Sequence, residues 1–122
     1  MSRIGKLAIN GTVNDIAMCG AIPMYLTTSL IIEEGFQLDD LRRILNSMRD
    51  AAEEADVEVV AGDTKVVSAG SADKIFINTS GIGVVEKEVG GSSAKIGDKI
   101  IINGFVGDHG TAILSEREGL DL

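Results

Sequence analysis

Polar side chains of kinds that bind cations and phosphate groups interrupt apolar stretches of this sequence at three places. In the first, GTVNDIAMCGA, Asn14 and Asp15 stand side by side within a hydrophobic segment. An isolated carboxylate buried among apolar side chains is strongly destabilising, so Asp15 must be paired, solvated or bound to a cation. A solvated helix face explains the pattern equally well.

The second place is VEVVAGDTKVV, where two β-branched runs are separated by Gly62, Asp63, Thr64 and Lys65. Asp63 offers hard oxygen ligands for Mg²⁺, Thr64 adds a hydroxyl, and Lys65 supplies a positive charge for a phosphoryl oxygen. Gly62 allows a sharp bend or the close approach of a phosphate. A structural turn with a surface ion pair is the alternative, because the cluster matches neither a Walker loop nor a dinucleotide-binding fingerprint.

The third place is NGFVGDHGTAIL, a glycine-bounded loop that opens a helix and contains Gly107, Asp108, His109 and Gly110. Free backbone N–H groups at a helix start can hold an anion. Ordinary helix capping by Asp108 is the alternative. Together, two carboxylates beside breaks in apolar elements and an amide-rich loop predict a site for a metal-bound nucleotide.

Two helices are predicted, and the first of them carries Asn14 and Asp15. One covers residues 3–18, where Gly5 and Gly11 indicate that another backbone or a ligand comes close. Its apolar face is expected to contain Ile4, Leu7, Ala8, Gly11, Ile16 and Ala17. The other has Asp39 and Asp40 in its first turn and apolar residues at steps of three and four. These residues are Leu38, Leu41, Leu45, Met48, Ala52 and Ala55.

Strands are predicted at MYLTTSLII, at 57–61, around 65–68 and at 75–85. The order helix, strand, helix, strand, strand indicates an α+β unit with a mixed sheet and helices on one face. The polar run EKEVGGSSAKIGD predicts a boundary near residue 90, so that residues 1–90 form one domain. Residues 91–122 would then be a linker followed by a strand, KIIINGF, and a helix that stops at Gly119.

Composition excludes several classes of function. The net charge is −8 and the 11 Lys and Arg residues are scattered, which argues against binding to nucleic acid or to an anionic membrane. The apolar stretch AIPMYLTTSLII is too short to span a bilayer. The one cysteine, Cys19, rules out an internal disulfide, predicts a cytoplasmic protein, and is expected to be a buried thiol among apolar neighbours.

Four segments in this order resemble the HypE family of hydrogenase maturation proteins, within the aminoimidazole ribonucleotide synthetase-like ATP-binding superfamily. They are GKLAINGTVNDIAMCGAIPMYLTTSLIIEEGF, VVAGDTKVV, INTSGIGVV and GDKIIINGFVGDHGTAILSEREGL. The resemblance covers essentially the whole chain. It implies an α+β N-terminal domain that forms a homodimer by packing two sheets together, with ATP and Mg²⁺ near the interface.

The activity that the resemblance implies is an ATP-dependent carbamoyl dehydratase reaction. It turns a thiocarboxamide on the family's C-terminal cysteine into a thiocyanate, the source of the cyanide ligands of [NiFe] hydrogenase iron. The implied partners are the carbamoyltransferase HypF and the HypC–HypD complex. Such a step depends on positioning and charge neutralisation.

The resemblance also implies roles for the residues singled out above. Asp15 and Asp63 would hold Mg²⁺, Asn14 and Thr64 would support the metal or the phosphates, and Lys65 would act catalytically by neutralising phosphoryl charge. The loop near the phosphates would be formed by Gly107, Asp108, His109 and Gly110.

The sequence departs from the family pattern in three respects. It lacks the family's N-terminal segment with further metal-binding acids, most of the second domain, and the C-terminal cysteine. We therefore expect an incomplete form that does not complete the reaction. Two alternatives stay open: another enzyme of the superfamily, of the thiamine-monophosphate kinase or selenophosphate synthetase type, or a non-catalytic dimerisation module.

Overall fold

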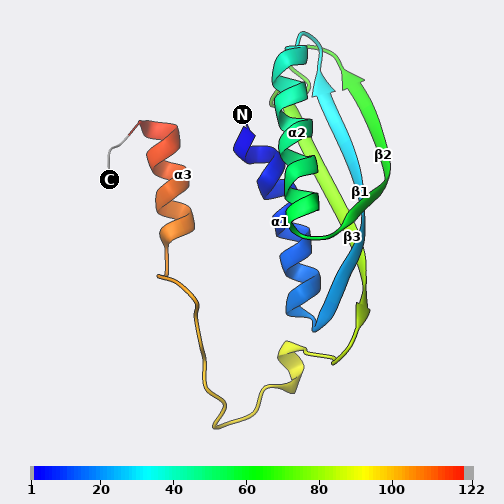
Figure 1. The fold of residues 1–122 in the computed structure, drawn as a ribbon. Helices are drawn as coiled ribbons and strands as arrows, with labels where there is room; N and C mark the ends of the chain where they lie inside the picture. The colour runs from blue at the N-terminus through cyan, green and yellow to red at the C-terminus, as the bar shows by residue number, and fades with distance from the viewer. Residues whose placement is uncertain (1, 120–122) are drawn as a thin grey trace. The chain divides into compact units, whose positions relative to one another are not determined.

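A computed structural model describes residues 2–119, and the chain divides into two compact units between Gly91 and Ser92. The first unit contains the elements α1 (Ser2–Met18), β1 (Ala21–Glu33), α2 (Leu38–Glu54), β2 (Glu58–Val67) and β3 (Ile75–Val85) (Figure 1). A short 3-10 helix, η1 (Gly91–Ser93), spans the boundary, and the second unit contains α3 (Asp108–Glu118). Within residues 2–119, no helix combines the length and the apolar character needed to cross a bilayer.

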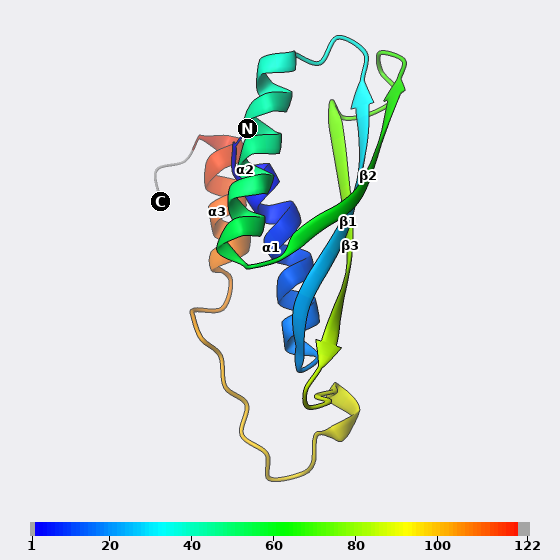
Figure 2. The same ribbon diagram turned by 45° about the vertical axis from the view of Figure 1, so that its right-hand side comes forward.

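The first unit has two layers, a three-stranded sheet and a pair of helices. The strand order is β2-β1-β3, with β1 parallel to β2 and antiparallel to β3. Both helices cover the same face of the sheet (Figure 2). The predicted α+β class, with a mixed sheet and helices on one face, is therefore confirmed.

The apolar core lies between the helices and the sheet. Ile9 of α1, Leu26 of β1 and Ile44 of α2 are fully buried there. Successive side chains of a strand point to opposite faces, so the buried residues of β1 alternate with exposed ones. Leu26, Leu30 and Ile32 face the helices, and Thr27, Ser29 and Ile31 face outward. We call the uncovered side the outer face of the sheet.

β2 is one continuous strand, and the predicted break at Gly62–Lys65 is wrong. Thr28, Ser29 and Ile31 of β1 lie opposite Gly62, Asp63 and Lys65 in register. β1 offers a full row of backbone partners along this stretch. Pairing with these backbone partners overrides the weak strand preference of Gly and Asp, because strand propensity depends strongly on context.

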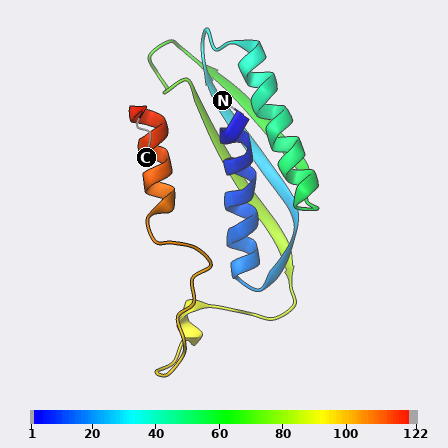
Figure 3. The same ribbon diagram turned by 60° about the vertical axis from the view of Figure 1, so that its left-hand side comes forward.

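The buried faces of the two helices match the expected ones only in part, with Met48 and Ala52 buried as predicted. In α1 the buried residues are Gly5 and Ile9, whereas Ile4 and Leu7 are exposed. In α2 the buried residues are Ile44, Met48, Ala51 and Ala52, whereas Leu38 and Leu45 are exposed. Both helices were placed correctly along the sequence. Their rotation follows from packing against each other and against the sheet, visible in Figure 3, which apolar spacing alone does not determine.

In the second unit, residues 99–105 form no strand, contrary to the prediction. Ile100 is 97% exposed and Ile101 is 84% exposed, since no strand pairs with them among the described residues. α3 begins after Gly107, which adopts a left-handed conformation with φ 98°, so the alternative of capping by Asp108 does not hold. Gly119, with φ 63°, ends the helix as predicted.

Gly5 lies where α1 crosses α2 closely, and a side chain there is expected to destabilise the protein. A methyl group at Gly5 would overlap the backbone carbonyl oxygen of Ile44 and touch Met48 Cγ at 3.1 Å. Alanine gains about 1 kcal/mol of helix propensity, but forcing packed helices apart costs about 1–3 kcal/mol. We expect Gly5→Ala to lower the free energy of unfolding in urea by up to about 2 kcal/mol.

The matched control is Gly11→Ala in the same helix. A Cβ at Gly11 meets no atom within 4 Å, so only the propensity gain applies. This variant should be more stable than the wild type by about 0.5–1 kcal/mol. Equal effects of the two substitutions would contradict the close crossing at Gly5.

Candidate functional site

Asp63 and Lys65 lie on the outer face of β2, two positions apart along the strand. Asp63 is in register with Ser29, an outward residue of β1, and both Asp63 and Lys65 are exposed. Asp63 Oδ1 accepts a hydrogen bond of 2.8 Å from the backbone N–H of Thr64. This bond orients the exposed carboxylate, whose oxygens are of the kind that Mg²⁺ prefers as ligands.

Gly62 and Thr64 alternate with these residues and belong to the helix side of the strand. A Cβ at Gly62 would lie 3.3 Å from Thr28 Cγ2 and 3.4 Å from the carbonyl oxygen of Thr28. The glycine thus permits close packing of β2 against β1. Oγ1 of Thr28 is buried and, in the described part of the chain, has no hydrogen-bond partner.

Asn14 and Asp15 lie in the C-terminal half of α1, and both are exposed. This half of the helix packs on β3. Thr12 Oγ1 and Thr79 Oγ1 are 2.6 Å apart, and Thr79 Oγ1 also donates to the carbonyl oxygen of Ala8 at 2.8 Å. Ile16, next to Asp15, packs on the glycines at positions 81 and 83. Asp15 is therefore carried by the part of α1 that covers β3.

Asp15 and Asp63 do not meet within one chain. β2 and β3 are opposite edges of the sheet, and Asp63 faces outward whereas α1 lies on the inner side. Among residues 2–119, no group of three His, Cys, Asp or Glu residues is placed to hold a metal ion. A single chain consequently does not offer both carboxylates to one Mg²⁺ ion.

The third candidate group belongs to the second unit. Gly107 is the N-cap of α3, and Asp108, His109 and Gly110 form its first turn, all exposed. The N–H of Thr111 donates to the carbonyl oxygen of Gly107 at 3.0 Å, the first hydrogen bond of the helix. The N–H groups that precede this bond belong to the helix start, where such groups commonly bind anions.

Cys19 is exposed, so the prediction of a buried thiol is wrong. The helix ends at Met18, and Cys19 lies in the turn that leads to β1. Its carbonyl oxygen accepts a hydrogen bond from Val89 N–H at 3.1 Å. Apolar neighbours in the sequence did not indicate burial, because the turn places this residue outside the core.

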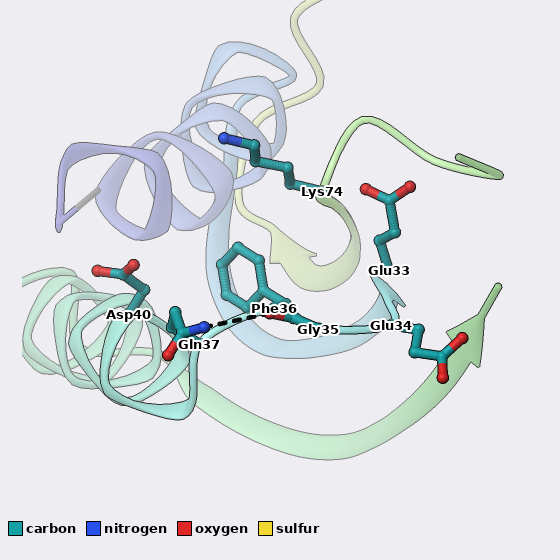
Figure 4. A pocket seen from close by; sticks show the side chains of 7 residues that line it. All are labelled: Glu33, Glu34, Gly35, Phe36, Gln37, Asp40 and Lys74. Carbon is teal, nitrogen blue, oxygen red and sulfur yellow. Dashed lines mark hydrogen bonds between the residues drawn. The ribbon is translucent and has the colours of Figure 1, made fainter. Parts of the chain in front are cut away.

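Sequence reasoning missed a polar pocket of 230 Å³ at the C-terminal end of β1 (Figure 4). It lies between the start of α2 and the residue that precedes β3, and none of the candidate residues lines it. Glu33 accepts a hydrogen bond from Gly70 N–H, and Phe36 forms part of the wall. The only sequence signal for it is the run EEGF, residues 33–36, between β1 and α2. The lining residues are Glu33, Glu34, Gly35, Phe36, Gln37, Asp40 and Lys74.

The outer face of the sheet is the other feature of the site region, and it is largely apolar. Tyr25 lies opposite Ile82, and Ile31 lies opposite Phe76. Ile82 is 66% exposed and Phe76 is 51% exposed. Polar residues, including Asp63, lie between these pairs in register. The apolar residues of the outer face are Ile22, Tyr25, Ile31, Val60, Phe76, Ile82 and Val84.

The class of protein is defined by three features together. They are a mixed sheet with two helices on one face, an apolar outer face of that sheet, and the segments VND and GDTK. Residues 1–85 match the family described as AIR synthase related protein, N-terminal domain. The chain belongs to this family.

Within the family, the chain is similar to hydrogenase maturation proteins. It is 55% identical over 120 residues to carbamoyl dehydratase HypE of Bradyrhizobium diazoefficiens, covering 97% of this chain and 35% of that protein. A crystal structure of HypE in complex with ATP superimposes with a TM-score of 0.94 and 52% identity, over 97% of this chain and 36% of the other. The crystal structure of a HypE–HypF complex superimposes with a TM-score of 0.93 and 57% identity, over 98% of this chain and 40% of the other.

The chain thus spans about a third of the length of the curated relatives it matches. The resemblance stated from the sequence motifs is confirmed by these relatives. The sequence and fold are shared along nearly the whole chain, including residues beyond the first unit.

Proposed function

We propose that this chain supplies an ATP-binding part of a carbamoyl dehydratase for [NiFe] hydrogenase maturation in the cytoplasm. The enzyme would dehydrate a thiocarboxamide on a C-terminal cysteine to a thiocyanate, the source of the cyanide ligands of iron. The observation that carries the proposal is the likeness to HypE in complex with ATP, at a TM-score of 0.94 over 97% of the chain. Bound ATP would supply the phosphoryl group that activates the amide oxygen.

The proposal includes a homodimer formed through the outer face of the sheet. A contiguous exposed apolar face of this kind marks an interaction site. A second copy carries the same face, so an isologous contact would bury Tyr25, Phe76 and Ile82 of both copies at once. The edges of the sheet, β2 and β3, are also open to strand pairing.

Such a dimer supports a nucleotide site shared between two chains. If the two-fold axis of this dimer runs along the strands, β2 at the edge of one copy lies beside β3 at the edge of the other. Asp63 of one chain would then lie at the same edge of the assembly as the partner's β3, whose other face is covered by the part of α1 that carries Asp15. In this arrangement the two carboxylates would hold Mg²⁺, and Lys65 would offset phosphate charge.

Removal of the metal tests the role of the carboxylates. The chain has a net charge of −8, so a bare triphosphate is repelled unless a divalent cation intervenes. In calorimetric titration we expect Mg·ATP to bind and ATP with EDTA to bind at least about tenfold more weakly. Equal heats with and without Mg²⁺ would contradict the metal site, and absence of heat in both would favour the dimerisation module.

The proposed protein partners are HypF and the HypC–HypD complex. Support for HypF is the likeness to the HypE chain of a HypE–HypF complex, with 57% identity over 98% of this chain. Co-elution of this chain with HypF in gel filtration tests the contact. Separate elution at concentrations of about 0.1 mM would contradict a contact carried by this part of the protein.

A further inference from the structure

Two threonine hydroxyl groups connect α1 to β3 through a chain of hydrogen bonds. Oγ1 of Thr79 donates to the backbone carbonyl oxygen of Ala8 at 2.8 Å and lies 2.6 Å from Oγ1 of Thr12. A hydroxyl group has one proton, and Thr79 uses its proton in the bond to Ala8, so Thr12 is the donor in the other bond. We call Thr12, Thr79 and the carbonyl group of Ala8 the hydroxyl clamp.

The hydroxyl clamp holds α1 at two points that are one helical turn apart. Ala8 and Thr12 are four residues apart, so they lie on the same face of the helix, about 6 Å apart along its axis. Both threonines are partly buried, so water competes only weakly for these bonds. Two attachments to one strand fix the rotation of the helix about its axis as well as its position along the strand.

Asn14 and Asp15 follow the hydroxyl clamp within one turn, and Ile16 anchors the helix on their other side. A Cβ at Gly81 would lie 2.6 Å from Cδ1 of Ile16, and a Cβ at Gly83 would lie 2.8 Å from Cγ2 of Ile16. The isoleucine therefore packs directly on the backbone of β3. The two polar residues are held between a hydrogen-bonded contact and a close apolar contact with the same strand.

The position of Asp15 in the helix is unfavourable for a carboxylate without a cation. Asp15 is exposed and lies in the last turn of α1, which contains no basic residue. The partial negative charge at the end of a helix repels a carboxylate in that turn. A cation bound at Asp15 would offset this repulsion, provided that the helix presents the side chain in the right direction.

We propose that Thr79 is a positioning residue for the cation site. Through the hydroxyl clamp it fixes the direction in which α1 presents Asn14 and Asp15. The inference rests on the proposed function, in which Asp15 holds Mg²⁺. Thr79 itself touches neither the metal nor the nucleotide in this account, so its effect on binding passes through α1.

Replacement of Thr79 by valine and by serine tests the role of its hydroxyl group. Thr79→Val keeps the shape but leaves Thr12 only a contact of 3.4 Å with the carbonyl oxygen of residue 79. We expect Mg·ATP to bind about tenfold more weakly, at the lower end of the effects seen for residues that orient metal ligands. Thr79→Ser keeps the hydroxyl group and should bind within about twofold of the wild type. Calorimetric titration in which valine binds as the wild type does, or serine fails to recover, would overturn the proposal.

Thr28→Val is the matched control. Thr28 lies on the helix side of the same sheet, and its Oγ1 is buried with no hydrogen-bond partner in the part of the chain that the structure describes. This substitution removes a hydroxyl group of the same kind but breaks no hydrogen bond. It should leave the affinity for Mg·ATP unchanged, and an equal loss in the two valine variants would count against the hydroxyl clamp.

A double-mutant cycle separates positioning from a merely structural role. If Thr79 acts through Asp15, adding Thr79→Val to an Asp15→Asn chain should weaken Mg·ATP binding by less than about twofold, because the two effects share one path. A further tenfold loss in that background would show that the threonine acts elsewhere, and it would overturn the proposal.

Hydrogen exchange examines the hydroxyl clamp without any ligand. The backbone amides of residues 15–18 should exchange about fivefold faster in Thr79→Val than in the wild type, and Thr28→Val should leave them unchanged. Equal exchange in the two valine variants would overturn the inference even where Mg·ATP binds. A wild type that binds no Mg·ATP would instead contradict the proposed function, and the exchange rates would still decide whether the clamp holds α1.

Discussion

Asp63→Asn is expected to lower the affinity for Mg·ATP about a hundredfold. The substitution keeps the size of the side chain and the hydrogen bond from Thr64 N–H, but it removes the charge that binds the cation. Mutation of a residue that only hydrogen-bonds to a metal ligand typically lowers metal affinity about 10- to 100-fold. Loss of the carboxylate ligand itself should therefore lower the affinity by about a hundredfold. The measurement is calorimetric titration of Mg·ATP into wild type and variant.

Asp73→Asn is the matched control, because it removes an exposed carboxylate from the connection between β2 and β3, away from the proposed ligands. It should bind Mg·ATP as the wild type does. If both asparagine variants lost affinity equally, the effect would be one of overall charge. If neither did, Asp63 would not be a metal ligand.

The second large effect is expected from Ile82→Asp, which tests the contact through the outer face of the sheet. Ile82 lies on the outer face opposite Tyr25, beside a shallow hollow of 120 Å³. A two-fold contact would bury two aspartates without partners. We expect the dissociation constant to rise about a thousandfold, and light scattering to report 12.8 kDa instead of twice that mass.

Leu38→Asp provides the comparison for this variant. Leu38 is also an exposed apolar residue, 67% accessible, but it begins α2 on the helix side of the sheet. The same change of charge there should leave the dimer intact. A monomer produced by both variants, or a dimer retained by both, would contradict association through the outer face.

The sequence predicted the order of elements because the signals were local and strong. Apolar residues at steps of three and four placed α2, and β-branched residues placed β1 and β3. Gly5 was correctly interpreted as a point of close approach, since α2 packs directly on it. Motif order identified the family, whose N-terminal domain matches residues 1–85.

The errors arose where distant parts of the chain decide the structure. Gly62 and Asp63 lie within a strand because β1 supplies backbone partners that no local pattern reveals. Residues 99–105 form no strand because among the described residues no partner strand is present. The separation of Asp15 and Asp63 onto opposite edges of the sheet also depends on the strand order, which spacing along the sequence does not contain.

A subunit-mixing experiment tests most directly whether Asp15 and Asp63 act together across two chains. Chains with Asp15→Asn and chains with Asp63→Asn are unfolded together, refolded as a mixture, and titrated with Mg·ATP. Each mixed dimer would contain one intact site, so about one quarter of the wild-type number of sites should return at full affinity. If the mixture binds no better than either variant alone, the two carboxylates do not form a shared site.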